Sequence, residues 1–341
     1  MNFKLKTGFA IAATALSLFA GVQGASAETK MRMTTSLPAP SFLYKDVLQV
    51  WADRVKESSG GELEIELFPA GTLGRDPATH YDMVRDGVAQ IGYIVPGYTP
   101  GTFPAATVVE LPGLVPSATA GGLAGAKLVE DGLIGANTAD NVKILGFFTG
   151  APTWLHTTDK KVETLDDVKG LKLRGAGPAL LSSIDAIGGT PIGGITVTNL
   201  AESLSRGLVD GTVNEWVAAT IFGVSKSTTY HLDVNMGTSP LMVIMNKSAY
   251  EGLSPELKKA IDDNSGAAFS KLWGDEFDKY IDIFLSKAKE DTNRTFTKPS
   301  AEEQAKWDAA LQPVIDNWIA ETPNGQAIYD AYLAALADAQ K

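Results

Sequence analysis

The chain has 341 residues, enough for two domains of ordinary size, and it carries 29 basic against 40 acidic side chains. This excess of negative charge argues against nucleic acid or an anionic membrane surface as a partner, because both attract basic patches. The sequence contains no cysteine, which excludes disulfides, thiolate metal sites, a cysteine nucleophile and a lipid anchor on cysteine.

The first 27 residues have the pattern of a secretory signal peptide. Lys4 and Lys6 precede an apolar run from Gly8 to Val22, and the run is followed by an A-x-A cleavage site that ends at Ala27. A membrane anchor is the alternative, but the run is short for a helix that crosses a bilayer. We therefore predict an exported protein whose mature chain has 27 basic and 40 acidic side chains, a net charge of −13.

Strand and helix patterns alternate after the leader. Strands are predicted at 31–35, 62–67 and 91–95, and helices from Ser41 to about residue 58 and from about residue 77 to 86. The order β-α-β-α-β is typical of a mostly parallel sheet. Residues 97–116 form a long loop rich in proline, glycine and aromatic residues. Such loops often carry function, and a plain surface crossing is the alternative.

The pattern then repeats. A helix at 120–130 and a strand at 143–148 come first, and Leu204–Asp210 afterwards resembles Val84–Gln90. In both segments a basic residue and a glycine end a helix before a strand. This indicates either two similar α/β lobes or a coincidence between two helix ends.

The C-terminal third is mainly helical. An apolar strand is predicted at 241–245, and a helical pattern from Ser254 to Phe284 is interrupted only at 264–266. A helix of this length can span two lobes. Residues 301–341 form amphipathic helix that covers apolar surface.

Arg174 lies at the C-terminal end of a short predicted strand. The sequence LKLRGAG at 171–177 alternates apolar and basic residues and then breaks at two glycines, and Pro178 opens a helix that we expect to reach Ile187. Ligands bind at this edge of open α/β sheets, and a guanidinium beside free backbone N–H groups suits a carboxylate. A surface arginine paired with a nearby acid is the alternative.

The sequence lacks the common catalytic motifs. His80, His156 and His231 do not have metal-ligand spacing, and the glycines at 175–177 lack the third glycine of a dinucleotide fingerprint. Neither a Walker loop nor a G-x-S-x-G elbow is present. We therefore predict no enzymatic activity, no cofactor and no metal. A secreted α/β enzyme that acts on a carboxylate is the alternative from another class.

Three segments resemble one family. FPAGTLG (68–74), DDVKGLKLRGAG (166–177) and GLVDGTVNEW (207–216) are similar to the periplasmic solute-binding subunits of tripartite ATP-independent periplasmic (TRAP) transporters, the DctP type. The resemblance covers essentially the whole mature chain, with the segments in the same order and at the same spacing. The binding component of an ABC importer is the alternative, but the long late helix and the spacing of the last two segments favour the TRAP type.

The resemblance implies an α/β fold of the two-lobed periplasmic-binding-protein type, with mixed sheets and with hinge strands and a long spanning helix joining the lobes. We expect lobe I to comprise residues 28–151 plus about 240–279, and lobe II residues 152–239 plus about 280–341. Members of the family bind a small-molecule organic acid in the periplasm and deliver it to TRAP membrane permease subunits. Most of them are monomers.

The resemblance also implies binding residues. The family's arginine in the KGLKLR strand forms a bidentate salt bridge with the ligand carboxylate, and it falls at Arg174. The asparagine after VDGQE in many members falls at Asn214, although this chain has Thr212 and Val213 before it. Sialic-acid-type members have a second arginine where this chain has Trp154.

The loss of that second charge favours a monocarboxylate with an apolar or aromatic body. Further aromatic residues at loop or strand ends support this prediction: Trp216, Tyr93, Tyr98, Phe42 and Phe148. The alternative is that these rings only pack between lobes and loops. A C4-dicarboxylate and a 2-oxo acid are the alternative ligands, since one arginine serves all three.

Overall fold

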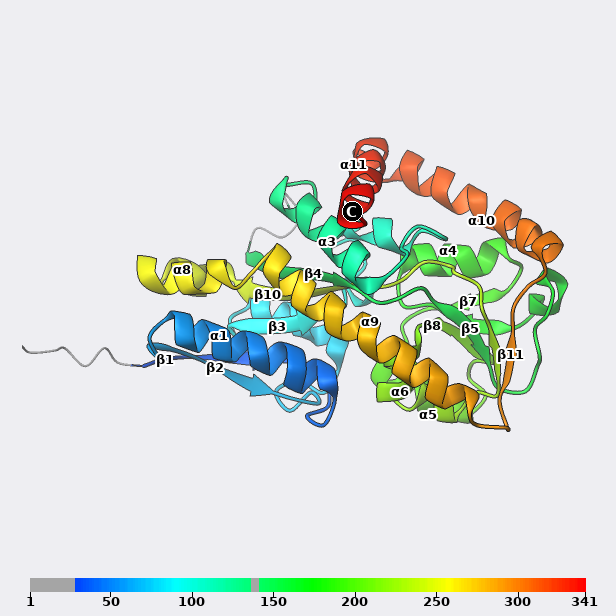
Figure 1. Ribbon diagram of the computed structural model, residues 1–341, viewed down its shortest axis with the longest axis horizontal. Coiled ribbons are helices and arrows are strands. Elements are labelled where there is room, and N and C mark those ends of the chain that lie inside the picture. Colours follow the sequence, from blue (N-terminus) through cyan, green and yellow to red (C-terminus); the bar gives the residue numbers. More distant parts are fainter. Residues whose placement is uncertain (1–27, 136–140) are drawn as a thin grey trace, which may run out of the picture.

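Two separate β-sheets organise the chain (Figure 1). The structure is a computed structural model that describes residues 28–135 and 141–341, so the predicted signal peptide lies outside the described residues. Within these two ranges, no helix has both the length and the apolar character needed to cross a membrane.

A five-stranded sheet contains the first β-α-β-α-β unit. Its strands are β1 (Thr29–Thr34), β2 (Leu63–Phe68), β3 (Ile91–Ile94), β4 (Val142–Thr149) and β10 (Pro240–Asn246). The order is β2-β1-β3-β10-β4, with β1 parallel to β2 and β3, and β10 antiparallel to β3 and β4. The five strands predicted in this part of the chain are confirmed, and the sheet is mixed because β10 returns from far along the sequence.

Strand β10, which lies between β3 and β4, is buried on both faces of this sheet. Val243 and Met245 of β10 belong to one core, whereas Met242 and Ile244 belong to the other. Successive side chains of a strand point to opposite faces, so a strand between two cores reads as a continuous apolar run. This explains the apolar sequence at 241–245.

The first predicted helix begins with a wider turn. It consists of a π-helical segment η1 (Leu43–Gln49) followed by α1 (Val50–Ser58). Phe42 and Val47 are five positions apart, the spacing that a π turn brings onto one face. Val47 and Trp51 are fully buried in the core.

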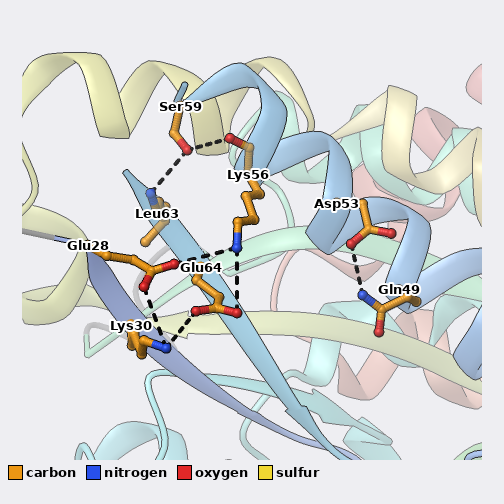
Figure 2. Close-up of polar contacts among 8 residues, drawn as sticks. All are labelled: Glu28, Lys30, Gln49, Asp53, Lys56, Ser59, Leu63 and Glu64. Atoms are coloured by element: carbon orange, nitrogen blue, oxygen red, sulfur yellow. Dashed lines mark hydrogen bonds and ion pairs between the residues drawn. The ribbon is translucent and has the colours of Figure 1, made fainter. Parts of the chain in front are cut away.

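An exposed charge network joins α1 to β1 and β2 (Figure 2). Lys30 Nζ lies 2.8 Å from Glu64 and 3.5 Å from Glu28, and Lys56 Nζ lies 3.4 Å from Glu28 and 3.6 Å from Glu64. The hydrogen bond from Lys30 lowers the pKa of Glu64. Because water and salt screen exposed pairs, each contributes little to the free energy of folding.

A six-stranded sheet forms the second half of the fold. Its strands are β5 (Trp154–Thr157), β6 (Lys172–Arg174), β7 (Thr190–Ile192), β8 (Gly211–Asn214), β9 (Tyr230–Leu232) and β11 (Thr295–Thr297). The order is β11-β9-β5-β8-β6-β7, with β6 parallel to β7 and β8, and β5 antiparallel to β8 and β9.

The two sheets share a topology, as the sequence repeat predicted. The helices of the repeated units are α2 (His80–Arg85), α4 (Pro178–Ala186) and α5 (Val197–Ser205), together with α1. The triplets β2-β1-β3 and β7-β6-β8 have the same parallel order, and an antiparallel strand lies beyond the third strand of each. Gly87 and Gly207, which end α2 and α5, both have positive φ, as a left-handed helix end requires.

Several segments join the sheets. Residues 150–153 and 233–239 cross side by side: Thr153 N donates to Gly237 O at 3.2 Å and Gly150 N to Ser239 O at 3.4 Å. The long predicted helix comprises α8 (Pro255–Asp263) and α9 (Ala267–Lys289), broken at the predicted interruption. In Figure 1, α9 crosses from the five-stranded sheet towards the six-stranded sheet.

The remaining helices pack around the two sheets. They are α3 (Ala118–Glu130), α6 (Trp216–Ile221), α7 (Lys247–Glu251), α10 (Ala301–Glu321) and α11 (Gly325–Ala339). Trp307 of α10 belongs to the core of the six-stranded sheet, and Trp318 of the same helix to a core of the five-stranded sheet. Helix α11 packs on α3 (Figure 1). In this contact Tyr332 Oη donates to Gly121 O at 3.2 Å. The division into lobes that we expect from the sequence assigns α11 to lobe II.

Candidate functional site

A cavity lies where the two sheets meet. It contains about 620 Å³ of empty space, part of it open to solvent. Its walls come from both sheets, from the crossing segments and from α9; they include Leu37, Leu43, Tyr93, Val95, Tyr98, Thr153, Arg174, Val197, Asn214, Glu215, Val217, Thr238, Leu241, Trp273 and Phe277. Apolar side chains predominate, and of the described residues that line the cavity Arg174 alone is basic.

Four of the predicted binding residues line this cavity: Tyr93, Tyr98, Arg174 and Asn214. The others lie elsewhere. Phe42 stacks on Tyr280 with ring centroids 3.8 Å apart, and Phe148 stacks on Trp273 at 4.6 Å.

Arg174 is held rigidly at the end of β6. Its side chain is buried, with 1% of the residue exposed. Nε donates to Ile195 O at 2.9 Å, and Nη2 donates to Tyr98 Oη at 3.2 Å. No carboxylate of the described residues lies within 4.0 Å of the guanidinium. The alternative of an exposed arginine paired with an acid therefore does not describe this residue.

Tyr98 connects the long 97–116 segment to the second sheet. It ends the short 3₁₀ turn η3 (Pro96–Tyr98), and its hydroxyl accepts from Val197 N at 2.9 Å. A Cβ on Gly97 would lie only 2.6 Å from Ala176 O, so a glycine is needed where these two segments touch. The segment thus reaches the arginine rather than merely crossing the surface.

Asn214 and Thr238 present polar atoms that lack partners. Asn214 ends β8, and its Nδ2 is buried without a hydrogen bond to any residue that the structure describes, as is Thr238 Oγ1. Both residues line the cavity. Buried donors without partners are costly, and a ligand would satisfy them. The sequence indicated Asn214 but held no local signal for Thr238, which lies in a crossing segment.

Glu215 adds a buried carboxyl to the cavity wall. It is the N-cap of α6, and its Oε1 accepts from Ala218 N at 2.7 Å. Burial raises the pKa of Glu215 to about 7. Burial also raises the pKa of the Tyr93 phenol well above its ordinary value. The acidic residue directly before a helix was the signal that would have identified Glu215 as a cap.

The N-terminus of α4 differs from our expectation of free N–H groups beside Arg174. The N–H of Ala179 donates to Glu110 Oε2 at 2.9 Å. Glu110 is fully buried and ends the 3₁₀ segment η4 (Pro104–Glu110). An internal carboxyl therefore occupies part of the position that the sequence suggested for a ligand carboxylate.

Trp154 and Trp216 belong to an aromatic cluster outside the cavity lining. Their ring centroids are 6.0 Å apart in a T-shaped arrangement, and His156 lies 4.9 Å from Trp216. Trp154 pairs with Asn214 in the register of β5 and β8. The cluster therefore packs behind a strand that contributes to the cavity.

Two histidines in this cluster are hydrogen-bonded to each other, and their partners determine which ring nitrogens carry the protons. His156 Nε2 lies 3.1 Å from Asn214 O, and His156 Nδ1 lies 2.8 Å from His231 Nδ1. A carbonyl only accepts, so His156 carries its proton on Nε2 and accepts at Nδ1 from His231. Burial lowers the pKa of both histidines, which keeps the pair neutral.

Comparison with known proteins identifies the family. The sequence profile of DctP, described as bacterial extracellular solute-binding protein family 7, matches residues 33–322. A marine metagenome TRAP solute-binding protein, specific for aromatic acid ligands and solved with 3-hydroxybenzoate, is similar in structure. It is 31% identical with a TM-score of 0.86, and the match covers 92% of this chain and 100% of that chain.

Two further relatives are similar. A TRAP solute-binding protein from Rhodoferax ferrireducens, solved with copurified benzoate, is 27% identical with a TM-score of 0.85 over 92% of this chain and 98% of its own. The 2,3-diketo-L-gulonate-binding periplasmic protein YiaO of Escherichia coli is 27% identical over 290 residues, 82% of this chain and 84% of its own.

The chain belongs to the DctP family of TRAP-transporter solute-binding proteins. The two-lobed α/β fold expected from the sequence is confirmed. Members of this family are extracytoplasmic binding proteins rather than enzymes; they bind small organic acids and work with membrane permease subunits.

Proposed function

We propose that this protein captures an organic monocarboxylate with an apolar or aromatic body and delivers it to the permease of a TRAP transporter. Arg174 forms the salt bridge to the ligand carboxylate. The observation that carries this proposal is a buried guanidinium without an acidic partner among the described residues, facing an apolar cavity. A buried charge is costly unless it is paired, and a ligand carboxylate supplies the missing charge.

The cavity walls support a monocarboxylate over a dicarboxylate. Beyond Arg174, the described lining residues offer no second cation, and Glu215 adds an acid. A second ligand carboxylate would therefore be desolvated without a partner. Two structural relatives, one solved with 3-hydroxybenzoate and the other with benzoate, support the same ligand class.

The remaining predicted residues have separate roles in this proposal. Asn214 donates its free Nδ2–H to the ligand, and the rings of Tyr93 and Tyr98 contact the ligand body. Trp154 and Trp216 act indirectly, because they pack against the strand that ends at Asn214. Phe42 precedes η1 and stacks on Tyr280 of α9, so it stabilises the packing of these two helices rather than contacting the ligand.

We also propose how the molecule is divided and where it acts. Residues 28–151 with about 240–279 form lobe I, and 152–239 with about 280–341 form lobe II. Helix α11 belongs to the second set by sequence, but it packs mainly on α3 of lobe I and also contacts α10. The mature protein acts in the periplasm as a monomer, after removal of residues 1–27.

The proposed ligand class is tested by thermal unfolding with a panel of acids. The panel contains aromatic monocarboxylates, 2-oxo acids, C4-dicarboxylates and sugar acids. A ligand at 100 times its Kd adds about 2.7 kcal/mol to the free energy of unfolding, which raises Tm by several degrees. We expect this shift with aromatic monocarboxylates. A shift with dicarboxylates or sugar acids alone would contradict the proposed ligand class.

The salt bridge is tested by Arg174→Lys. We expect a folded protein whose affinity for its acid is about tenfold to a hundredfold weaker, because an ammonium does not match two carboxylate oxygens. Arg206→Lys is the matched control, since Arg206 is the exposed C-cap residue of α5 and pairs with Glu202. Calorimetric titration measures both variants. Unchanged affinity in Arg174→Lys would exclude Arg174 as the carboxylate ligand.

A further inference from the structure

Two helices beside Arg174 begin without caps of their own. The N-cap residues are Gly177 for α4 and Thr196 for α5; glycine has no side chain, and Thr196 Oγ1 accepts from no backbone N–H of α5. The first N–H groups of a helix have no partner within the helix. Both helix starts are linked to the arginine, because α4 follows it after a short turn and Ile195 O accepts from its Nε.

Side chains from the other lobe satisfy these N–H groups. Tyr98 Oη accepts from Val197 N of α5 at 2.9 Å, and Glu110 Oε2 accepts from Ala179 N of α4 at 2.9 Å. Both side chains come from η3 and η4, which pack on β10 of the five-stranded sheet. One segment, 96–110, thus caps two helices of the other sheet.

The fit around Glu110 is close. A Cβ on Gly177 would lie 1.8 Å from Glu110 Oε1, so the carboxyl occupies the space that any other side chain at 177 would fill. On the other side of the turn, Gly97 approaches Ala176 O. The turn at 175–177, which directly follows Arg174, is therefore enclosed between two parts of the 96–110 segment.

We propose that Glu110 is a positioning residue for ligand binding: by capping α4 from the opposite lobe, it fixes the turn that orients Arg174. The expected effect of Glu110 on ligand affinity rests on the proposed function. A buried carboxyl is costly to keep. Glu110 compensates for part of that cost by satisfying a helix N-terminus, where the helix dipole favours a negative or polar group.

The experiment compares Glu110→Ala and Glu110→Asp with Glu110→Gln. Alanine removes the acceptor, and aspartate shortens it by one methylene, whereas the glutamine carbonyl still accepts from Ala179 N. Glu303→Ala and Glu303→Gln are matched controls, because Glu303 is also nearly buried, at 7% exposed, and accepts from the N–H of a distant residue, Leu165. Circular dichroism selects the variants that fold.

The first readout needs no ligand. The hydrogen-exchange rate of the peptide covering 178–187 should rise about fivefold in Glu110→Ala and Glu110→Asp, because one lost helix cap changes the free energy by about 1 kcal/mol. In Glu110→Gln the rate should return towards that of wild type. The Glu303 variants should leave this peptide unchanged. Equal exchange in all Glu110 variants and wild type would overturn the proposal.

The second readout is the affinity for benzoate and 3-hydroxybenzoate by calorimetry. We expect a loss of about fivefold in Glu110→Ala and Glu110→Asp, recovered in Glu110→Gln and absent in the Glu303 variants. If Glu303→Ala weakens binding equally, Glu110 has no special role. If wild type binds neither acid, the proposed ligand class fails and hydrogen exchange still decides the role of Glu110. If wild type binds and the Glu110 variants match it, only the positioning role fails.

Discussion

Ionisable side chains that are buried gather around the cavity. Arg174, Glu110 and Glu215 are each less than a tenth exposed, although charged residues are seldom buried unless they are paired. Burial raises the pKa of Glu110 to about 8 and that of Glu215 to about 7. The cavity wall therefore carries the permanent positive charge of Arg174 and the Glu215 carboxyl, which is about half protonated near pH 7, whereas the Glu110 carboxyl lies outside the lining and is mostly protonated there.

This arrangement predicts a pH-dependent contribution from Glu215. A folded-state pKa of about 7 lies above the ordinary value of 4.5. The contribution to stability is therefore complete below pH 4.5 and is lost as the pH rises towards 7. Between these values, the free energy of unfolding of wild type relative to Glu215→Gln should fall by about 1.4 kcal/mol per pH unit.

The comparison with Glu215→Gln isolates one carboxyl. His156 and His231 have lowered pKa values, so their contribution runs in the opposite direction and is lost as the pH falls below 6.5. Urea unfolding of both proteins between pH 5 and 8 measures the difference. A difference that does not change with pH would show that Glu215 titrates as an exposed carboxyl does.

At the scale of elements, close helix contacts hold α9 in place across the two sheets. Gly274 of α9 faces α3 so closely that a Cβ would lie 2.4 Å from Thr119 Cα. Gly122 of α3 is also buried in a helix, but a Cβ there would have its nearest neighbour at 3.6 Å. The same substitution therefore meets backbone at one position and has room at the other.

We predict opposite effects for Gly274→Ala and Gly122→Ala. Alanine improves helix propensity by about 1 kcal/mol at either position. At Gly274 a clash with backbone outweighs this gain, and we expect a net loss of about 1–3 kcal/mol. Gly122→Ala should be neutral or stabilising. Urea midpoints measure both variants, and equal effects would show that α9 does not rest on α3 as described.

At the scale of the whole molecule, the two sheets are joined by several crossings rather than by one linker. The crossing segments 150–153 and 233–239 are hydrogen-bonded to each other, and α9 and α10 also pass between the sheets. The cavity lies among these connections. Arg174 and Asn214 come from the six-stranded sheet and Tyr93 from the five-stranded sheet, so a ligand between them contacts both.

We predict that the mature protein is a monomer and that its mass does not depend on protein concentration. Its net charge of −13 makes copies repel each other, and a high net charge favours soluble monomers. Light scattering after size exclusion should give the mass of one mature chain at both low and high salt, with and without benzoate. A mass that doubles with concentration would contradict this prediction.

Local patterns in the amino-acid sequence predicted much of the architecture. Alternation predicted the edge strand β2, an apolar run predicted β10, and the glycine–proline break after Arg174 placed the arginine at the end of β6. These features depend on neighbours a few residues apart, so the sequence alone contains them. The segments at 68–74, 166–177 and 207–216 were sufficient to identify the family.

Only the tertiary structure decided what lies beside the arginine. Glu110 and Ala179 are 69 residues apart, and Thr238 reaches the cavity from a crossing segment. Trp154 is beside Asn214 in the sheet register, yet it packs into a cluster behind the cavity. Side-chain direction and long-range contact depend on how separate elements pack, and local periodicity carries no information about that.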